Sequence, residues 1–162
     1  MRLALTLLCA LLAPITAARA AEEFNPYQAS IDRMPIADAM RQIEAHYGPT
    51  KEPRTYENGT VTVMGGTDHD LSLFLFCDGK MAGMSASVST EVAAKILLPL
   101  TGPDAKVEVF GTDDGVMLSL LGHTLTFYYR GIGTKSSNVI ATYPTEVFNV
   151  FQFERYCDEL KS

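Results

Sequence analysis

Apolar residues recur at helical spacing in the first third of the chain. Within residues 35–47 they lie four, three and four positions apart, which places them on one face of a helix. They are Ile36, Met40, Ile43 and Tyr47. Pro35 suits the first turn, where its missing N–H needs no partner, and Gly48-Pro49 ends the pattern. A helix is therefore predicted over 35–47.

Alternation with a period of two follows this segment and predicts strands. Two apolar runs, 71–77 and 80–88, are separated by Asp78-Gly79. An alternating segment at 60–63 follows Asn58-Gly59 in the same way. Both dipeptides favour two-residue hairpin turns, because Asn, Asp and Gly tolerate positive φ. The block is expected to form consecutive antiparallel strands.

A similar order of elements occupies the second half of the chain. Ser89 or Thr90 can cap a short helix that runs through Leu98. Further strands are indicated by the segments 106–111, 116–121, 124–130 and 139–143. A last helix is predicted from Thr145 to about Leu160, although its middle, FQFE, also alternates as a strand would.

These elements predict one α+β domain over 35–162, with an antiparallel sheet of six to seven strands packed by about three helices. Residues 21–34 are polar and are expected to form a loosely tied N-terminal arm. A helix followed by three strands occurs twice, and segment 60–68 aligns with 106–113. Internal duplication explains this likeness, and so does the common preference of hairpin strands for Val, Thr and Gly. Both interpretations stay open.

The two sides of the segment 71–77 differ in character, because its leucines alternate with its phenylalanines. The leucine side ends in Cys77 and is expected to be covered by the C-terminal helix. On that assumption Phe74 and Phe76 lie on the far face of the sheet, together with Tyr128. An uncovered face with these aromatic residues is typical of a protein-binding surface. The alternative is that the first helix or a loop covers it.

The first 20 residues are typical of a secretory signal peptide. Arg2 supplies a positive start, residues 3–17 carry no charge, and Ala18-Arg19-Ala20 matches an A-x-A cleavage site. A membrane anchor is the alternative, but the apolar run is short and ends in small residues. The protein is expected to be periplasmic or secreted after cleavage near Ala20, without stable insertion in a membrane.

Cleavage of the signal segment would remove Cys9, so the exported protein keeps two cysteines, Cys77 and Cys157. An even pair in an oxidising compartment predicts a disulfide. The bond would close a loop of about 80 residues, which contributes roughly 4.5 kcal/mol in the chain-entropy model. A reactive or metal-binding pair is the alternative, and two cysteines so far apart are a weak metal signal.

Charge and composition narrow the partner classes. Hydrophobic residues make up 47% of the chain, which excludes an intrinsically disordered protein. The net charge is −6, and it becomes −8 when Arg2 and Arg19 leave with the signal segment, with 11 basic against 19 acidic residues. Such acidity disfavours nucleic acid and anionic membranes as partners. It fits a basic protein partner, or solubility alone.

Catalytic signatures are missing from the sequence, including a nucleophile elbow, a P-loop and a His-Glu-x-x-His motif. The most site-like segment is Asp68-His69-Asp70, which could bind a cation or supply a base. The similar segment 111–115 lacks a histidine and resembles a turn, so a solvated turn is the other interpretation. Copper binding through methionine is disfavoured, because Met81 and Met84 would face opposite sides of a strand. No catalytic residue, cofactor or metal ligand is predicted.

The leading functional hypothesis is a small exported protein that acts by non-catalytic protein–protein interaction. An inhibitor or immunity-type protein is one form, and an envelope-assembly factor is another. The basis is small size, one disulfide, acidity and the missing catalytic motifs. The alternatives are a small exported hydrolase that uses Asp68, His69 and Asp70, or a metal carrier. The partner and the oligomeric state are left open by the sequence.

Overall fold

The computed structural model describes residues 23–66, 71–131, 138–150 and 152–162. Over these ranges the chain forms an α+β fold with eight strands and five α-helices, against the six to seven strands and three helices expected. The strands are β1 (Arg54–Thr55), β2 (Val61–Gly65), β3 (Ser72–Cys77), β4 (Lys80–Val88), β5 (Val107–Thr112), β6 (Gly115–Leu120), β7 (Leu125–Arg130) and β8 (Asn138–Tyr143). The helices are α1 (Pro26–Ile31), α2 (Ile36–Tyr47), α3 (Thr90–Leu97), α4 (Thr145–Val150) and α5 (Phe153–Glu159).

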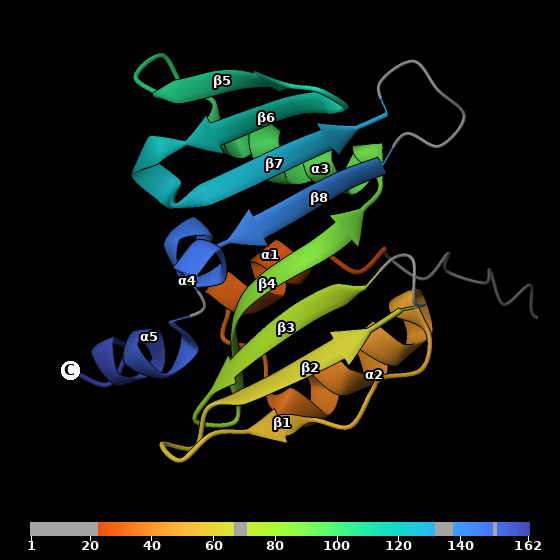
Figure 1. Ribbon diagram of the computed structural model, residues 1–162, viewed down its shortest axis with the longest axis vertical. Helices are drawn as coiled ribbons and strands as arrows, with labels where there is room; N and C mark the ends of the chain where they lie inside the picture. The colour runs from red at the N-terminus through yellow and green to blue at the C-terminus, as the bar shows by residue number, and fades with distance from the viewer. Residues whose placement is uncertain (1–22, 67–70, 132–137, 151) are drawn as a thin grey trace, which may run out of the picture.

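All eight strands belong to one open antiparallel sheet with the order β1-β2-β3-β4-β8-β7-β6-β5. The first four strands form one half and the last four the other, and the halves meet where β4 pairs with β8 (Figure 1). The meanders β2-β3-β4 and β5-β6-β7 flank β8, and each follows a helix on the same side of the sheet. The arrangement leaves β1 and β5 as the two edges.

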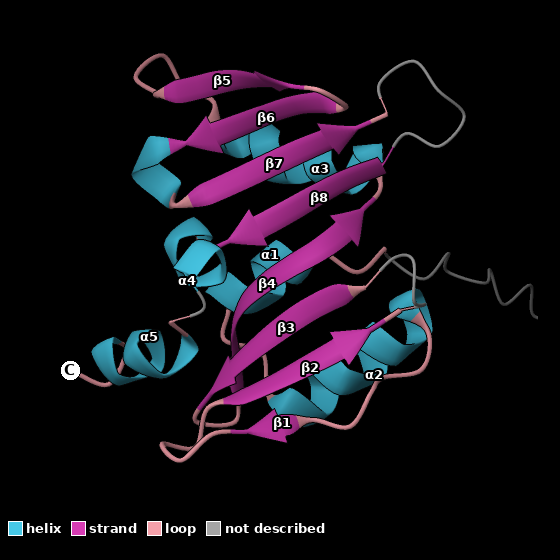
Figure 2. Cartoon of the chain, in the orientation of Figure 1, coloured by secondary structure: helices cyan, strands magenta, loops and turns pink. Residues whose placement is uncertain are grey.

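One side of the sheet is covered by α1, α2 and α3 (Figure 2). The buried face of α2 carries Ala39 and Ile43, which belong to one hydrophobic cluster with Phe74 and Phe76 of β3. The helix begins at Ile36, one residue after the predicted start, with Pro35 as the N-cap and Gly48 at φ 84° after the last turn. Ser89 caps α3 by accepting a hydrogen bond from the Val92 amide, as the sequence indicates. The main core therefore lies between these helices and the strands.

The other side of the sheet is covered only in part, by α4 and α5 (Figure 1). Leu75 and Ala82 of the sheet pack there against Phe148 and Phe153. A single helix was expected over 145–160, but α4 ends at Val150 and α5 begins at Phe153. The strand alternative is wrong over α5, whose Phe153 side chain is buried in this second core.

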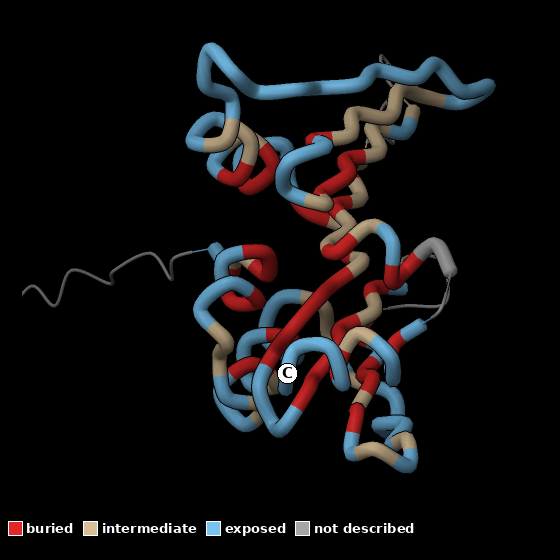
Figure 3. Tube along the Cα trace, turned by 90° about the vertical axis from the view of Figure 1, so that its left-hand side faces the viewer, coloured by how far each residue is buried: buried red, intermediate tan, exposed pale blue. Residues whose placement is uncertain are grey.

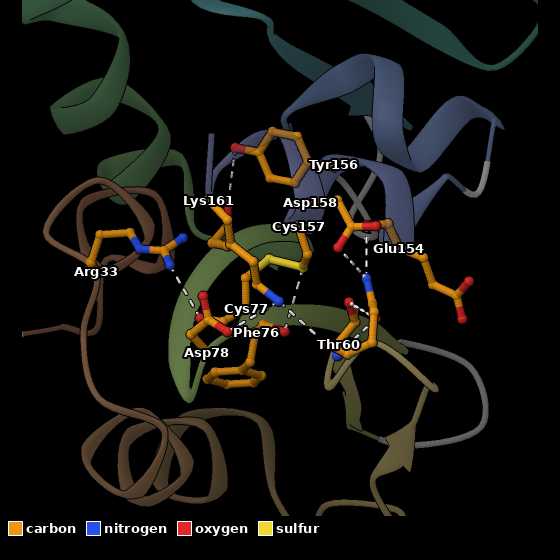
Figure 4. The surroundings of a disulfide bond; sticks show 12 residues. Arg33, Thr60, Phe76, Cys77, Asp78, Glu154, Tyr156, Cys157, Asp158 and Lys161 are labelled. Atoms are coloured by element: carbon orange, nitrogen blue, oxygen red, sulfur yellow. Dashed lines mark hydrogen bonds and ion pairs between the residues drawn. A yellow bond between two sulfur atoms is a disulfide. The ribbon is translucent and has the colours of Figure 1, made fainter.

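A disulfide joins Cys77 at the end of β3 to Cys157 in α5, with their Cα atoms 5.3 Å apart (Figure 4). The predicted bond is confirmed, and the separation lies in the normal range for disulfides. Lys161 adds an ion pair to Asp78, 3.3 Å between Nζ and Oδ1. The bond ties the C-terminal helix to the first half of the sheet.

Residues 23–34 differ from the loosely tied arm that was expected. They contain α1, which packs on β4 and buries Phe24, Tyr27, Ala29 and Ser30. Asn25 caps the helix by accepting a hydrogen bond from the Gln28 amide. The ring centroids of Tyr27 and Tyr143 lie 5.2 Å apart. The segment is part of the core because residues 26, 27, 29 and 30 lie on one face of α1, whereas Ile31 is exposed.

The hairpin turns agree with the sequence in position. Asp78 and Gly79 adopt φ 52° and 68°, as a mirror-image two-residue turn requires. At the other turn only Gly59 has positive φ, 83°, while the Asn58 side chain accepts a hydrogen bond from the Thr60 amide. The amide of Asn58 also donates to the Glu154 carbonyl and to Asp158, which attaches the turn to α5.

Burial is uneven along the sheet (Figure 3). Strands β3 and β4 are almost wholly buried, whereas every residue of β5 is exposed. The described helices are all too short or too polar to cross a bilayer.

Candidate functional site

Phe74 and Phe76 are fully buried, so the prediction that they form an exposed surface is wrong. They lie under α2, with the ring of Phe74 5.1 Å from that of Tyr47. The alternative, that the first helix covers this face, is the one the structure shows. The physical reason is that α2 packs on the phenylalanine face of β3, while α5 packs on its leucine face.

Tyr128 of β7 lies in a different environment. Its neighbours Leu125 and Phe127 point into the main core, as the alternation predicts, and Tyr128 points to the opposite side of the sheet. This side of strands β5–β8 faces the viewer in Figure 1, and of the described helices only α4 reaches it, at the end of the strands where Thr145 contacts Thr126. Tyr128 is half-buried there. We call this side of β5–β8 the open face.

An apolar row crosses the open face in register with Tyr128. Phe110 pairs with Met117, Met117 with Tyr128, and Tyr128 with Ile140, one residue from each of four adjacent strands. Residues in such register have Cβ atoms about 4.5–5.5 Å apart and contact one another directly. Phe110 is 44% exposed, and the other three side chains are half-buried. The row is thus a continuous apolar strip in contact with solvent.

The Glu108 carboxylate and four hydroxyl side chains form a second row beside the first. Glu108, Ser119, Thr126, Thr142 and Ser85 are paired in register across five strands. The hydroxyls of Ser85 and Thr142 lie 3.1 Å apart, and those of Thr126 and Thr145 lie 2.8 Å apart. These hydroxyls hydrogen-bond to one another, whereas Glu108 at the edge of the sheet is exposed.

Asp114 borders the strip on its other side and fixes Tyr128. The Tyr128 hydroxyl donates a hydrogen bond to Asp114 Oδ1, and Arg130 Nε donates to Oδ2 at 3.0 Å. The hydrogen bond from Tyr128 and, after it, that from Arg130 hold the pKa of the Asp114 carboxyl below its usual value. The aromatic ring is therefore held across the strip by its hydroxyl.

The described residues give little support to a catalytic or metal-binding role of a histidine. Asp68, His69 and Asp70 lie outside them. His46 accepts a hydrogen bond from the Phe24 amide at Nε2, and its Nδ1 lies 2.9 Å from the Gln42 carbonyl, so both ring nitrogens are engaged. His123 is exposed at the end of a 3₁₀ turn. Groups of three or more metal-ligating side chains do not occur in the part of the chain that the structure describes.

A hollow of about 600 Å³ lies between the end of α2, the end of β4 and the start of α3. His46 and Ser89 line it, together with Ser87. The Ser89 hydroxyl is used as the cap of α3 and His46 is used as described above. The Ser89 hydroxyl and the His46 ring are thus both engaged in the fold.

Sequence reasoning found Tyr128 but missed Phe110, Met117 and Ile140. Each of them lies in a segment that was predicted as a strand. Alternation could have shown their side, but the pairing that aligns them depends on the sheet order, with β8 inserted beside β4. The available signal was the period-two pattern on 106–111 and 116–121, read together with Tyr128.

Comparison with known proteins gives no further guidance, because the chain matches no protein-family model, no curated protein and no solved structure.

Proposed function

We propose that this protein is exported and acts by non-catalytic binding of a protein partner on the open face of β5–β8. The observation that carries the proposal is the apolar strip Phe110–Met117–Tyr128–Ile140, aligned across four strands on the open face. The inhibitor-type and envelope-assembly roles are both forms of this activity.

The composition of the strip supports a protein ligand. Aromatic residues and methionine are enriched in the centres of protein interfaces, where they supply most of the binding free energy. Tyr128 is also held in place by Asp114, so little conformational entropy is lost when a partner packs on it. A polar hydroxyl row and an ion pair flank the strip, as the rim of an interface does.

The charge of the chain supports a basic partner. The net charge is −6 for the whole sequence, and Glu108 lies on the open face next to Phe110. A basic partner would be attracted over a distance of about 10 Å at 0.1 M salt and would associate faster at low salt. Its binding is therefore expected to weaken as salt rises.

Export is supported by the disulfide and by the signal-like first 20 residues. The Cys77–Cys157 bond is of a kind that persists in the periplasm or outside the cell, and is rare where thiols are kept reduced. The partner is therefore expected in the same compartment.

The test compares two charge substitutions at apolar surface residues. Met117→Lys changes the centre of the strip, and Leu98→Lys makes the same change at a 70% exposed leucine after α3, on the other side of the sheet. Both variants and the original oxidised protein are immobilised and exposed to envelope extract of the host at low salt. A protein retained by the original and by Leu98→Lys, but lost from Met117→Lys, is then purified.

With that purified protein, Met117→Lys is expected to weaken binding at least tenfold, and Leu98→Lys less than twofold. Equal binding to all three, or no protein that distinguishes them, contradicts the proposal. Circular dichroism of each variant shows that the fold is retained.

A further inference from the structure

The two edges of the sheet are protected to very different degrees. Edge strands expose unpaired backbone N–H and C=O groups, which natural proteins shield by short strands, proline or charge. Strand β1 has two residues, and it follows Lys51, Glu52 and Pro53 and contains Arg54. Strand β5 has six residues, VEVFGT, with one charge and no proline. The β5 edge therefore has fewer of the features that hinder pairing with another strand.

The register of the β5–β6 hairpin shows which backbone groups of β5 are available. The Leu121 amide donates to the Lys106 carbonyl at 3.1 Å, so the polar groups of Lys106 point toward β6. Because these groups alternate along an antiparallel strand, those of 108, 110 and 112 point the same way. The N–H and C=O of Val107, Val109 and Gly111 point away from the sheet.

Exposed apolar side chains gather at the same edge. Among the described residues, nine large hydrophobic side chains are exposed, and Val107, Val109, Phe110 and Leu121 are four of them. Val109 is 64% exposed, on the side of the sheet that carries α3. The other side of β5 presents Phe110. A strand added at this edge would cover apolar groups on both sides as well as pairing the backbone.

We propose that the occupant of the β5 edge is a second copy of this chain, with β5 paired antiparallel to β5 of the copy about a two-fold axis. The pairing does not rest on the proposed function, because it uses the backbone of the β5 edge, and of the apolar strip only Phe110 takes part in it. The axis passes between the two Phe110 residues, perpendicular to the sheet. The dimer then contains one continuous sheet.

The choice of a second copy as the occupant rests on the self-complementarity of the β5 edge. With Phe110 opposite Phe110 of the copy, Val109 falls opposite Gly111, and both have outward-pointing backbone groups that can exchange two hydrogen bonds. The apolar strip then continues through the axis into the strip of the copy, with an aromatic pair at its centre. Glu108 falls opposite Thr112, so like charges are not opposed. A shift by one residue either way breaks the direct alignment of the two strips.

The first measurement is the mass in solution by light scattering after size exclusion, from about 1 to 200 µM. A concentration-dependent dimer is expected. Added salt should leave it unchanged or strengthen it, because the two copies carry the same net charge of −6. Binding to a basic partner should weaken with salt, so failure of one proposal is distinguishable from failure of the other.

Substitutions locate the interface. Val109→Lys places a charge on the outward edge, and it is expected to weaken dimerisation at least tenfold. Thr55→Lys places the same charge on β1, and it should leave the dimer unchanged. Circular dichroism and thermal unfolding of each variant show whether the fold is retained.

Cysteine substitutions test the register without depending on those variants. Phe110→Cys should form a disulfide between copies on mild oxidation, because non-hydrogen-bonded partners lie about 4.5 Å apart at Cα, within disulfide range. Glu108→Cys should not, because its two copies lie four positions out of register, more than about 13 Å apart.

Hydrogen exchange gives an independent check in the original protein. The Val109 and Gly111 amides should exchange more slowly as concentration rises, whereas the inward Phe110 amide should change little. A protein that stays monomeric up to 200 µM overturns the proposal. This holds even if Val109→Lys fails to bind a partner that the original protein captures, because the edge would then pair with a strand of another protein. A dimer that Val109→Lys does not weaken also overturns it.

Discussion

Cys157 in α5 is bonded to Cys77 at the end of β3, and its Sγ also lies 3.8 Å from the Phe76 carbonyl. The bond spans 80 residues of sequence and brings the C-terminal helix onto the sheet. Its neighbours Leu75 and Phe153 are buried in the second core. The smaller of the two cores is thus closed by a covalent link.

Loss of this link is expected to lower the free energy of unfolding by about 2–5 kcal/mol, because a closed loop restricts the unfolded chain. The variant Cys77→Ala/Cys157→Ala, compared with the original in urea at equilibrium, measures the loss. Adding a reductant should destabilise the original and leave the double variant unchanged. An equal effect of reductant on both would contradict the prediction.

Phenylalanines of the core and of the surface should respond differently to truncation. Phe74→Ala removes a fully buried ring and is expected to cost about 3–5 kcal/mol. Phe110→Ala removes a ring that is 44% exposed on an edge strand, and it should cost less than about 1 kcal/mol. Urea unfolding of both variants at low protein concentration checks this. Similar losses at both sites would mean that Phe110 is packed in solution.

Gly115, the first residue of β6, should not tolerate a side chain. A Cβ built there lies 2.1 Å from the Tyr129 carbonyl oxygen, so the neighbouring backbone of β7 would have to move. Gly115→Ala is expected to destabilise the protein by more than about 2 kcal/mol. Gly122→Ala is the control, because nothing lies within 4 Å of its Cβ position. Thermal unfolding should separate the two variants clearly.

The Asp114 carboxyl should titrate below its usual pKa in the folded protein, because Tyr128 and Arg130 stabilise the charged form. A lowered pKa in the folded state favours folding above the ordinary carboxyl pKa, and this contribution is lost as pH falls through the lowered value. Tyr128→Phe should move the Asp114 pKa back upward. Carbon-detected NMR of the carboxyl measures both values.

Tyr129→Phe is the matched control for that titration, since the neighbouring ring packs against the main core on the other side of the sheet. It should leave the Asp114 pKa unchanged. An identical pKa in the original and in Tyr128→Phe would show that the hydroxyl does not hold the carboxylate in solution.

The N-terminal processing site gives a further prediction. The Ala18-Arg19-Ala20 pattern predicts that the exported protein begins at Ala21. N-terminal sequencing, or the intact mass after export in the native host, measures this directly. A mature protein that retains residues 1–20 in the membrane fraction would indicate an anchor instead.

The sequence alone determined the local features of this protein. The helix over 35–47, the Asp78-Gly79 turn and the sides of β7 follow from periodicity and from the residues that permit positive φ. The Cys77–Cys157 bond follows from compartment and from an even count. These features depend on neighbours within a few residues or on chemistry alone, so tertiary contacts did not alter them.

Tertiary structure decided which surfaces are covered. Phe74 and Tyr128 follow the same alternation, but α2 packs over Phe74 while no described helix packs over Tyr128. The apolar strip exists because the sheet order aligns Phe110, Met117 and Ile140 with Tyr128. Alternation tells on which side of a strand a residue lies. Coverage and register depend on where distant helices and strands pack, and that is set by the burial of the whole chain.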